Sequence, residues 1–197
     1  MKKIIKLILA IGVILALIFI FYNYTSPAKE TLLASYTPDT INVIMVQPPS
    51  SIQPKGQQIG QTFILTGGTA RVTKVIFKLA LNPYNLATSG DIYCDLYALN
   101  STGYPTGAVL ETSAPESVTS LTTTLSDVSF IFTGDVTIPT NSVAVLRGDF
   151  LPSGSQVKVN VMNTGGGYGG VVFIHTTGWQ LYSVFDAYFQ VYGIPTP

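Results

Sequence analysis

Short runs in which apolar and polar residues alternate are the feature that most constrains the fold of this chain. In the clearest run, over residues 71–81, Phe77 and Leu79 alternate with Lys74 and Lys78. A period of two residues indicates a β-strand with one buried face. Similar runs recur at the spacing typical of a β-sandwich. We expect strands over residues 60–65, 71–81, 91–99, 126–132, 142–150, 155–162, 170–175 and 185–192.

The segments between these runs are rich in Gly, Pro, Ser and Thr, which are typical of turns. No segment after Tyr22 repeats with the 3.6-residue period of a helix. Roughly nine or ten strands joined in this way predict an all-β domain, an antiparallel β-sandwich of the jelly-roll type. We expect the domain to cover residues 41–197, behind a polar tether over residues 23–40.

The first 22 residues are the most apolar part of the chain. Residues 7–21 contain no charged and no strongly polar side chain, and as a helix they would rise ~22 Å. Residues 4–6, with a lysine that can extend toward water, bring this length near the ~30 Å hydrocarbon core of a bilayer. The three lysines before residue 7 favour a cytoplasmic N-terminus. The sequence therefore predicts contact with a membrane through residues 4–22 and delivery of the remaining chain to the outside.

The same 22 residues also have features of a cleavable secretory signal. Ser26-Pro27-Ala28 offers a site of the small-x-small type, although Pro27 stands in its middle. The apolar run reaches the upper length of such a signal, and it ends in Phe19, Phe21 and Tyr22, which resemble an interfacial aromatic belt. These two features favour an uncleaved anchor. Two localisations stay open: a single-pass membrane protein with an extracellular C-terminal domain, or a secreted protein if the leader is removed.

Charge and cysteine content exclude several classes of protein. Charged residues make up 10% of the chain, and after Glu30 there are six basic and nine acidic residues, a net charge of −3. We therefore expect no nucleic-acid partner, because such binding needs a basic surface. Cys94 is the only cysteine and cannot form an internal disulfide. Because it alternates with Ile92 and Leu96, we expect it to be a small buried apolar residue.

The residues that an enzyme would need are few. His175 is the only histidine, and no serine stands in a G-x-S-x-G setting, so we expect His175 at a strand end or in a loop. One histidine and one cysteine far apart in sequence do not make a zinc site. The glycine-rich run 165–170 precedes a strand-like run, whereas a phosphate loop precedes a helix. We therefore expect a protein that is not an enzyme.

A series of stretches occurs in the order seen in a known type of module. It resembles the jelly-roll, carbohydrate-binding-like modules of secreted and surface proteins of bacteria, archaea and phages, over about residues 58–194. The resemblance implies a fold more firmly than a ligand. The stretches that carry it are Gly60-Gln61-Thr62-Phe63, Val72-Thr73-Lys74-Val75-Ile76-Phe77-Lys78-Leu79, Asp91-Ile92-Tyr93-Cys94-Asp95-Leu96-Tyr97-Ala98, Gly103-Tyr104-Pro105-Thr106-Gly107-Ala108-Val109-Leu110 and Phe185-Asp186-Ala187-Tyr188-Phe189-Gln190-Val191-Tyr192-Gly193, with Gly178-Trp179-Gln180 before the last of them.

The resemblance also implies one structural calcium ion, which modules of this type often carry. Asp186, on the expected last strand, is the residue at which we expect it. Calcium takes six to eight oxygen ligands, so backbone carbonyls near residues 60–62 would have to contribute.

Aromatic residues in expected turns and loops predict a surface that binds sugars. Trp179 follows Thr176-Thr177-Gly178, Tyr104 and Tyr168 stand among Gly and Pro, and Tyr182 is near Trp179 in sequence. Exposed rings stack on the apolar C–H faces of sugars. The alternative is that these rings cover the ends of the sheets as packing. We interpret the chain as a non-catalytic binding or adhesion module for glycans or surface partners.

A structural role is the competing interpretation. Ile41–Val46 is strongly β-prone and is followed by the break Gln47-Pro48-Pro49. Such a segment could add to the open edge of a sheet in a neighbouring subunit and build a homo-oligomer, a filament or a virion. The simpler alternative is that it forms the first strand of its own domain.

Two sequons for N-glycosylation also occur, Asn23-Tyr24-Thr25 and Asn100-Ser101-Thr102. Such triplets are common by chance, and their use depends on the organism. Neither triplet by itself therefore assigns a modification.

Overall fold

The computed structural model describes residues 11–18, 28–37, 42–48, 57–163, 172–175, 179–182 and 185–196. For residues 42, 44, 163, 172–175, 181 and 182 it describes the backbone only. Residues 11–18 are helical, and this described part of the chain contains no helix with the length and apolar character needed to cross a membrane. The rest of the expected membrane segment lies outside the described residues.

The described strands form two antiparallel sheets, and we call the one with eight strands the larger sheet. Its members are β1 (Thr31–Tyr36), β2 (Asn42–Val46), β4 (Ala70–Leu81), β8 (Ser126–Ile131), β9 (Thr137–Ile138), β11 (Val157–Asn163), β14 (Phe185–Ala187) and β15 (Phe189–Pro195). The main order is β1-β15-β4-β11-β14, with β2 paired to β11 and with β8 and β9 paired to β4. The strand β4, with twelve residues, therefore pairs with four other strands of this sheet, β8, β9, β11 and β15.

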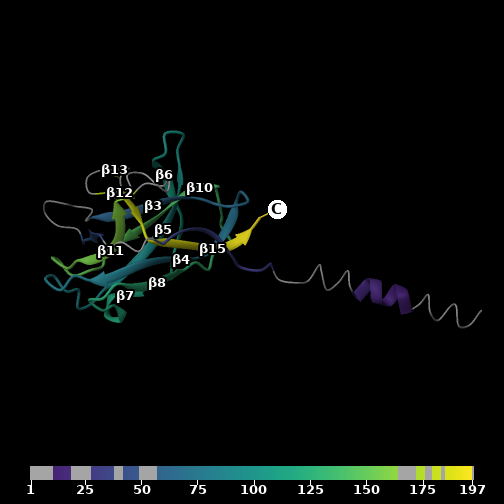
Figure 1. Ribbon diagram of the computed structural model, residues 1–197, viewed down its shortest axis with the longest axis horizontal. Helices are drawn as coiled ribbons and strands as arrows, with labels where there is room; N and C mark the ends of the chain where they lie inside the picture. The colour runs from purple at the N-terminus through teal and green to yellow at the C-terminus, as the bar shows by residue number, and fades with distance from the viewer. Residues whose placement is uncertain are drawn as a thin grey trace, which may run out of the picture.

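The smaller sheet has seven strands among the described residues. They are β3 (Gln58–Ile64), β5 (Asp91–Leu99), β6 (Pro105–Thr112), β7 (Glu116–Ser117), β10 (Asn141–Arg147), β12 (Val172–His175) and β13 (Trp179–Tyr182), and a short 3-10 helix, η1 (Val118–Ser120), follows β7. The order is β13-β12-β3-β10-β5-β6, with β7 paired to β5. In Figure 1, β3 and β10 lie in the upper part of the domain, and β4 and β8 lie in the lower part.

The inner faces of the two sheets form one apolar core. In β4 the expected alternation is present, because Phe77 and Leu79 are fully buried. The ring of Phe63 in β3 lies 6.3 Å, centroid to centroid, from that of Phe189 in β15, so side chains of the two sheets meet between the layers. Cys94 is also fully buried, as expected for a small apolar residue. The prediction of an all-β, antiparallel fold in two layers is confirmed.

One polar side chain also joins the two sheets. Gln61 of β3 faces the interior and is fully buried. Its Oε1 atom accepts a hydrogen bond of 2.6 Å from the backbone N–H of Ala187 in β14. Its Nε2 atom donates to the backbone oxygen of Thr62 at 3.0 Å and lies 3.5 Å from Oδ1 of Asp186. Gln61 thereby gives a buried backbone N–H of the other sheet the partner it needs.

The structure differs from the sequence analysis over residues 31–36, which lie within the segment 23–40 that we expected to be a tether. Residues 31–36 form β1, which pairs with β15 from Thr31 opposite Gly193 to Tyr36 opposite Phe189. Leu33 of β1 is only 2% exposed. The strand fits closely because position 193 is a glycine: a Cβ atom there would lie 2.8 Å from Cδ1 of Leu33. The burial of this leucine explains the difference, because the mainly polar composition of residues 23–40 gives no sign that a side chain within them is buried.

Residues 42–46 form β2, which pairs with β11 of the same chain from Asn42 opposite Val161 to Val46 opposite Val157. Val46 is fully buried in the core. The segment is therefore a strand of its own domain, as in the simpler of the two alternatives, although it follows β1 and is not the first strand. Donation of this strand to a neighbour would require the same pairing to form between copies.

Candidate functional site

The outer side of the smaller sheet carries an unusual row of side chains on β5. Ile92, Cys94 and Leu96 point into the core and are fully buried. The intervening residues therefore face outward, and two of them are the partly exposed tyrosines Tyr93 and Tyr97. Four residues along a strand span ~13 Å, so the two rings mark the ends of a row.

Strand β10, beside β5, is buried on both faces. Val143 and Val145 point outward, yet both are fully buried. They form a small apolar cluster of their own, with Tyr97, Leu99 and Trp179 packed against it. Gly60 of β3 makes room for the cluster, because a Cβ atom at that position would lie 3.0 Å from Cγ2 of Val145. A second core thus covers part of the outer face.

Trp179 lies over this cluster from a distant strand. It belongs to β13, which pairs with β12, and β12 in turn pairs with β3. Its ring contacts that of Tyr97 edge to face, with centroids 6.2 Å apart and an interplanar angle of 76°. Neighbouring strands are ~4.8 Å apart, so Trp179 reaches β5 only because the hairpin of β12 and β13 curls over the outer face.

A charged cluster lies next to these rings. Asp95, between the two tyrosines of β5, is 1% exposed. Nε of Arg147 lies 2.5 Å from Oδ2 of Asp95, and Nη1 of Arg147 lies 2.5 Å from Oδ2 of Asp149. Thr112 of β6 donates a hydrogen bond of 2.7 Å to Oδ1 of Asp95. One guanidinium between two carboxylates leaves the cluster with a net charge of −1.

The environment shifts the pKa of two groups in this region. Burial raises the pKa of the Tyr97 hydroxyl, and the charge of Asp95 raises it further, against the opposing effect of Arg147. Burial lowers the pKa of Arg147, but its hydrogen bond to Asp149 and the charge of Asp95 outweigh burial and leave the pKa raised. At neutral pH Tyr97 is therefore a neutral donor, and Arg147 is a cation held by two carboxylates.

The other end of the row is also aromatic. The guanidinium carbon of Arg147 lies 5.3 Å from the ring centroid of Tyr93. The ring of Phe150 lies 5.2 Å from that of Tyr93, and Phe150 is 59% exposed. We call the four aromatic residues Trp179, Tyr97, Tyr93 and Phe150, together with the charged residues Asp95, Arg147 and Asp149, the aromatic face.

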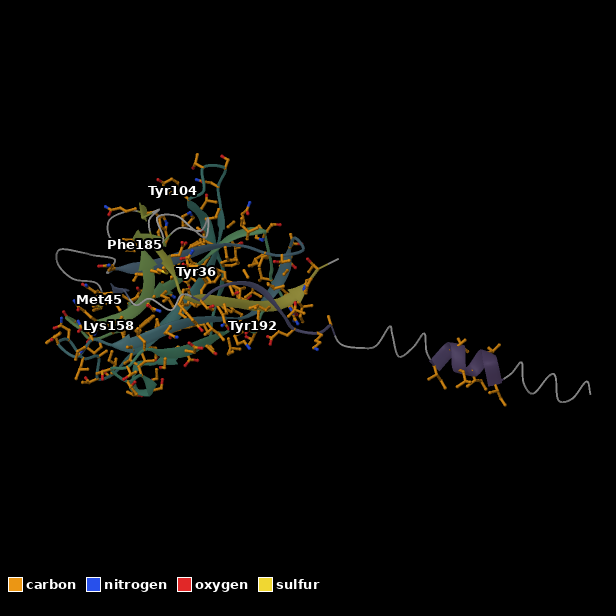
Figure 2. All side chains as sticks on the ribbon, in the orientation of Figure 1. Tyr36, Met45, Tyr104, Lys158, Phe185 and Tyr192 are labelled. Atoms are coloured by element: carbon orange, nitrogen blue, oxygen red, sulfur yellow. The ribbon has the colours of Figure 1, made fainter. Side chains whose placement is uncertain are left out.

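The outer side of the larger sheet also carries tyrosines, but the protein's own lysines cover them. Nζ of Lys74 lies 4.2 Å from the ring centroid of Tyr192, and Nζ of Lys78 lies 4.4 Å from that of Tyr188. Tyr188 is only 7% exposed. These rings are therefore less free to stack on a ligand than those of the aromatic face. In Figure 2, Tyr192 lies in the lower part of the domain and Tyr104 in the upper part.

The four residues expected to bind sugar are placed differently from one another. Trp179 lies in a strand instead of a turn and is partly buried, and it contributes to the aromatic face. Tyr104 precedes β6 and is 37% exposed. Tyr182 pairs with Val172 through its backbone, but its side chain is outside the described part. Tyr168 lies outside the described residues, as does the glycine-rich run 165–170.

Asp186, the expected calcium ligand, is fully buried in β14 near Gln61. Within the described residues, no three side chains of His, Cys, Asp or Glu gather closely enough to hold a metal ion. Calcium at Asp186 stays a prediction. His175 ends β12, where its backbone pairs with Gln58 of β3 and with Trp179 of β13.

The sequence analysis missed all of the aromatic face except Trp179, namely Tyr93, Tyr97, Phe150, Asp95, Arg147 and Asp149. A signal for part of it was present, because the alternation that assigns Ile92 to the core assigns Tyr93 and Tyr97 to the other face. No comparable signal marks Phe150 or Arg147. Their contacts with β5 depend on how the strands pair.

Comparison with known proteins identifies no family whose binding site could be compared with the aromatic face. No protein-family model matches this chain, and no curated protein matches it.

Proposed function

We propose that this protein is a non-catalytic binding module for glycans and that the aromatic face is its binding surface. The observation that carries the proposal is the contact of Trp179 with Tyr97 over the buried valines of β10, directly beside the cluster of Asp95, Arg147 and Asp149. Rings fixed on a packed base lose little conformational freedom when a ligand stacks on them. Such a surface suits the apolar C–H faces of a sugar.

The charged cluster supplies groups that can form hydrogen bonds with the hydroxyl groups of a sugar. Sugar hydroxyls donate hydrogen bonds, and the partly exposed carboxylate of Asp149 offers acceptors. Arg147 is bound by Asp95 on one side and Asp149 on the other, so it is not available to pair with an acidic sugar. The net charge of −1 opposes an anionic ligand as well. The ligand class that this supports is a neutral saccharide.

The N-terminal segment supports display of the domain on a membrane surface. The side chains of residues 11–18 are apolar on all sides of the helix except at Gly12, and Ile14 and Leu15 are 55% and 60% exposed. A helix that is apolar all round is stable only inside a core or a bilayer. We propose that residues 4–22 enter the membrane or serve as an export signal, and that the domain lies outside the cell. We further propose that the strands of the exported domain are connected as in a jelly roll.

A glycan panel tests the proposal. The full chain, held in detergent micelles, is applied to immobilised neutral oligosaccharides and to uronic-acid and sialylated ones. We expect binding to some of the neutral set. Tyr97→Leu and Trp179→Leu keep an apolar cover over the valines but remove a ring, and each should weaken binding at least about tenfold, or ~1.4 kcal/mol.

Tyr192→Leu is the matched control, because Tyr192 is a partly exposed tyrosine on a strand of the opposite sheet. It should bind as the unchanged chain does. Absence of binding to every neutral glycan, or an equal loss in Tyr192→Leu, would refute the assignment of the aromatic face.

A further inference from the structure

We propose that Asn100 is a site of covalent modification, the acceptor of an N-linked oligosaccharide. This inference rests on export of the domain in the proposed function, but it does not depend on what the aromatic face binds. The triplet Asn100-Ser101-Thr102 has the required sequence, and a usable acceptor also needs an exposed asparagine with a free side-chain amide.

The asparagine stands at a projecting turn. The last pairing of β5 with β10 is at Ala98, so residues 99–105 extend beyond the neighbouring strand of the sheet. Figure 1 shows a hairpin beside β6 that rises above the domain, and Figure 2 shows Tyr104 beside it. Asn100, Ser101 and Thr102 are all exposed. A transferase can therefore approach the triplet without unfolding the sheet.

Hydrogen bonds fix the geometry of the triplet. The N–H of Gly103 donates to the backbone oxygen of Asn100 at 2.9 Å, which closes a β-turn, and Gly103 has a φ of 82° that favours glycine. Within this turn, Oδ1 of Asn100 accepts from the N–H of Thr102 at 3.0 Å, from Oγ1 of Thr102 at 2.7 Å and from the N–H of Tyr104 at 2.9 Å. All three bonds are to the oxygen. The Nδ2 amide group makes no hydrogen bond within the described residues.

This arrangement suits the chemistry of the transfer. The bond that forms joins Nδ2 of Asn100 to the anomeric carbon of the sugar, and the bond that breaks joins that carbon to a phosphate oxygen of a lipid-linked donor. The lipid phosphate leaves with the bonding electrons, and Nδ2 gives up one proton to a base of the transferase. Donors to Oδ1, above all the hydroxyl of Thr102, polarise the amide through its oxygen and leave Nδ2 unbonded within the described residues.

The test uses the full chain expressed in a host that attaches N-glycans to exported proteins, with Asn23→Gln in every sample to remove the other sequon. We expect a mass increase that an amidase specific for N-glycans removes. Asn100→Asp should abolish the increase, yet keep an oxygen that accepts the same three hydrogen bonds and so preserve the turn. Thr102→Val should abolish it as well, while Thr102→Ser and the matched control Ser101→Ala should retain it.

Protease protection of the intact cells reports export in the same experiment. A chain that is delivered outside but carries no mass added at Asn100 would overturn this inference and leave the binding proposal standing. A chain that stays inside would overturn the proposed export of the domain and, with it, this inference.

Discussion

Replacement of Arg147 by methionine should lower the stability of this domain far more than the same change at another arginine. Arg147 pairs with Asp95, which is 1% exposed and cannot recover its hydration when its partner is removed. Breaking a buried ion pair on one side typically costs ~3–5 kcal/mol, because a charge is left buried without compensation. For a chain of this size 1 kcal/mol shifts Tm by about 2–4 °C, so Tm should fall by about 6–20 °C.

Arg71→Met is the matched control. Nη1 of Arg71 lies 2.5 Å from Oδ1 of Asp135, the distance that Nε of Arg147 keeps from Asp95, but the two side chains are 36% and 89% exposed. An exposed pair contributes only ~0–1 kcal/mol. The variant should therefore change Tm by no more than about 4 °C.

The assay is thermal and urea unfolding of the full chain in detergent, followed by circular dichroism. The double variant Asp95→Asn with Arg147→Met should recover most of the lost stability, because Asn carries no charge and still accepts the hydrogen bond of Thr112. Equal losses in Arg147→Met and Arg71→Met would refute the argument that burial makes the Arg147 pair the stronger one. So would a failure of the double variant to recover stability.

Two further predictions concern the interior. Gln61→Leu leaves the N–H of Ala187 without its acceptor and should lower the free energy of unfolding by ~1–3 kcal/mol, with faster hydrogen exchange at Ala187. Burial and the charge of Asp95 raise the pKa of the Cys94 thiol. The thiol of the unfolded chain ionises near pH ~8.5, whereas the thiol of the folded protein stays protonated at this pH. The contribution of the thiol to the free energy of unfolding should therefore be fully present below that pH and should fall as the pH rises above it. Cys94→Ala should remove this fall between about pH 8.5 and 9.5 in urea unfolding.

How well the sequence predicts the strands depends on whether they show, by their own alternation of apolar and polar residues, which face is buried. β4 and β5 do, because one face of each packs on the core, and their bounds lie within one residue of those expected. β1 does not, because its buried residues Leu33 and Ala34 are adjacent in sequence and do not alternate with polar ones. Its short apolar stretch among polar residues could not be told from a tether.

The candidate site was harder to predict than the fold. Trp179 could be singled out as an aromatic residue near a turn, but its partner Tyr97 is 82 residues earlier in the sequence. The two meet only because the hairpin of β12 and β13 curls over β10. Likewise Arg147 joins Asp95 through the register of β10 against β5, in which Val145 lies opposite Asp95. Pairing between distant strands, which no single run of residues encodes, creates the aromatic face.

The most direct test of the central claim is the fluorescence of Trp179, the only tryptophan of the chain, during titration with neutral oligosaccharides. Its ring lies against Tyr97 on the proposed binding surface, so a bound sugar must change its surroundings. We expect a saturable shift of emission with a neutral glycan, no shift with its uronic-acid counterpart, and a shift at least about tenfold weaker in affinity for Tyr97→Leu. Emission that stays constant across the whole neutral panel would contradict a sugar-binding role for the aromatic face.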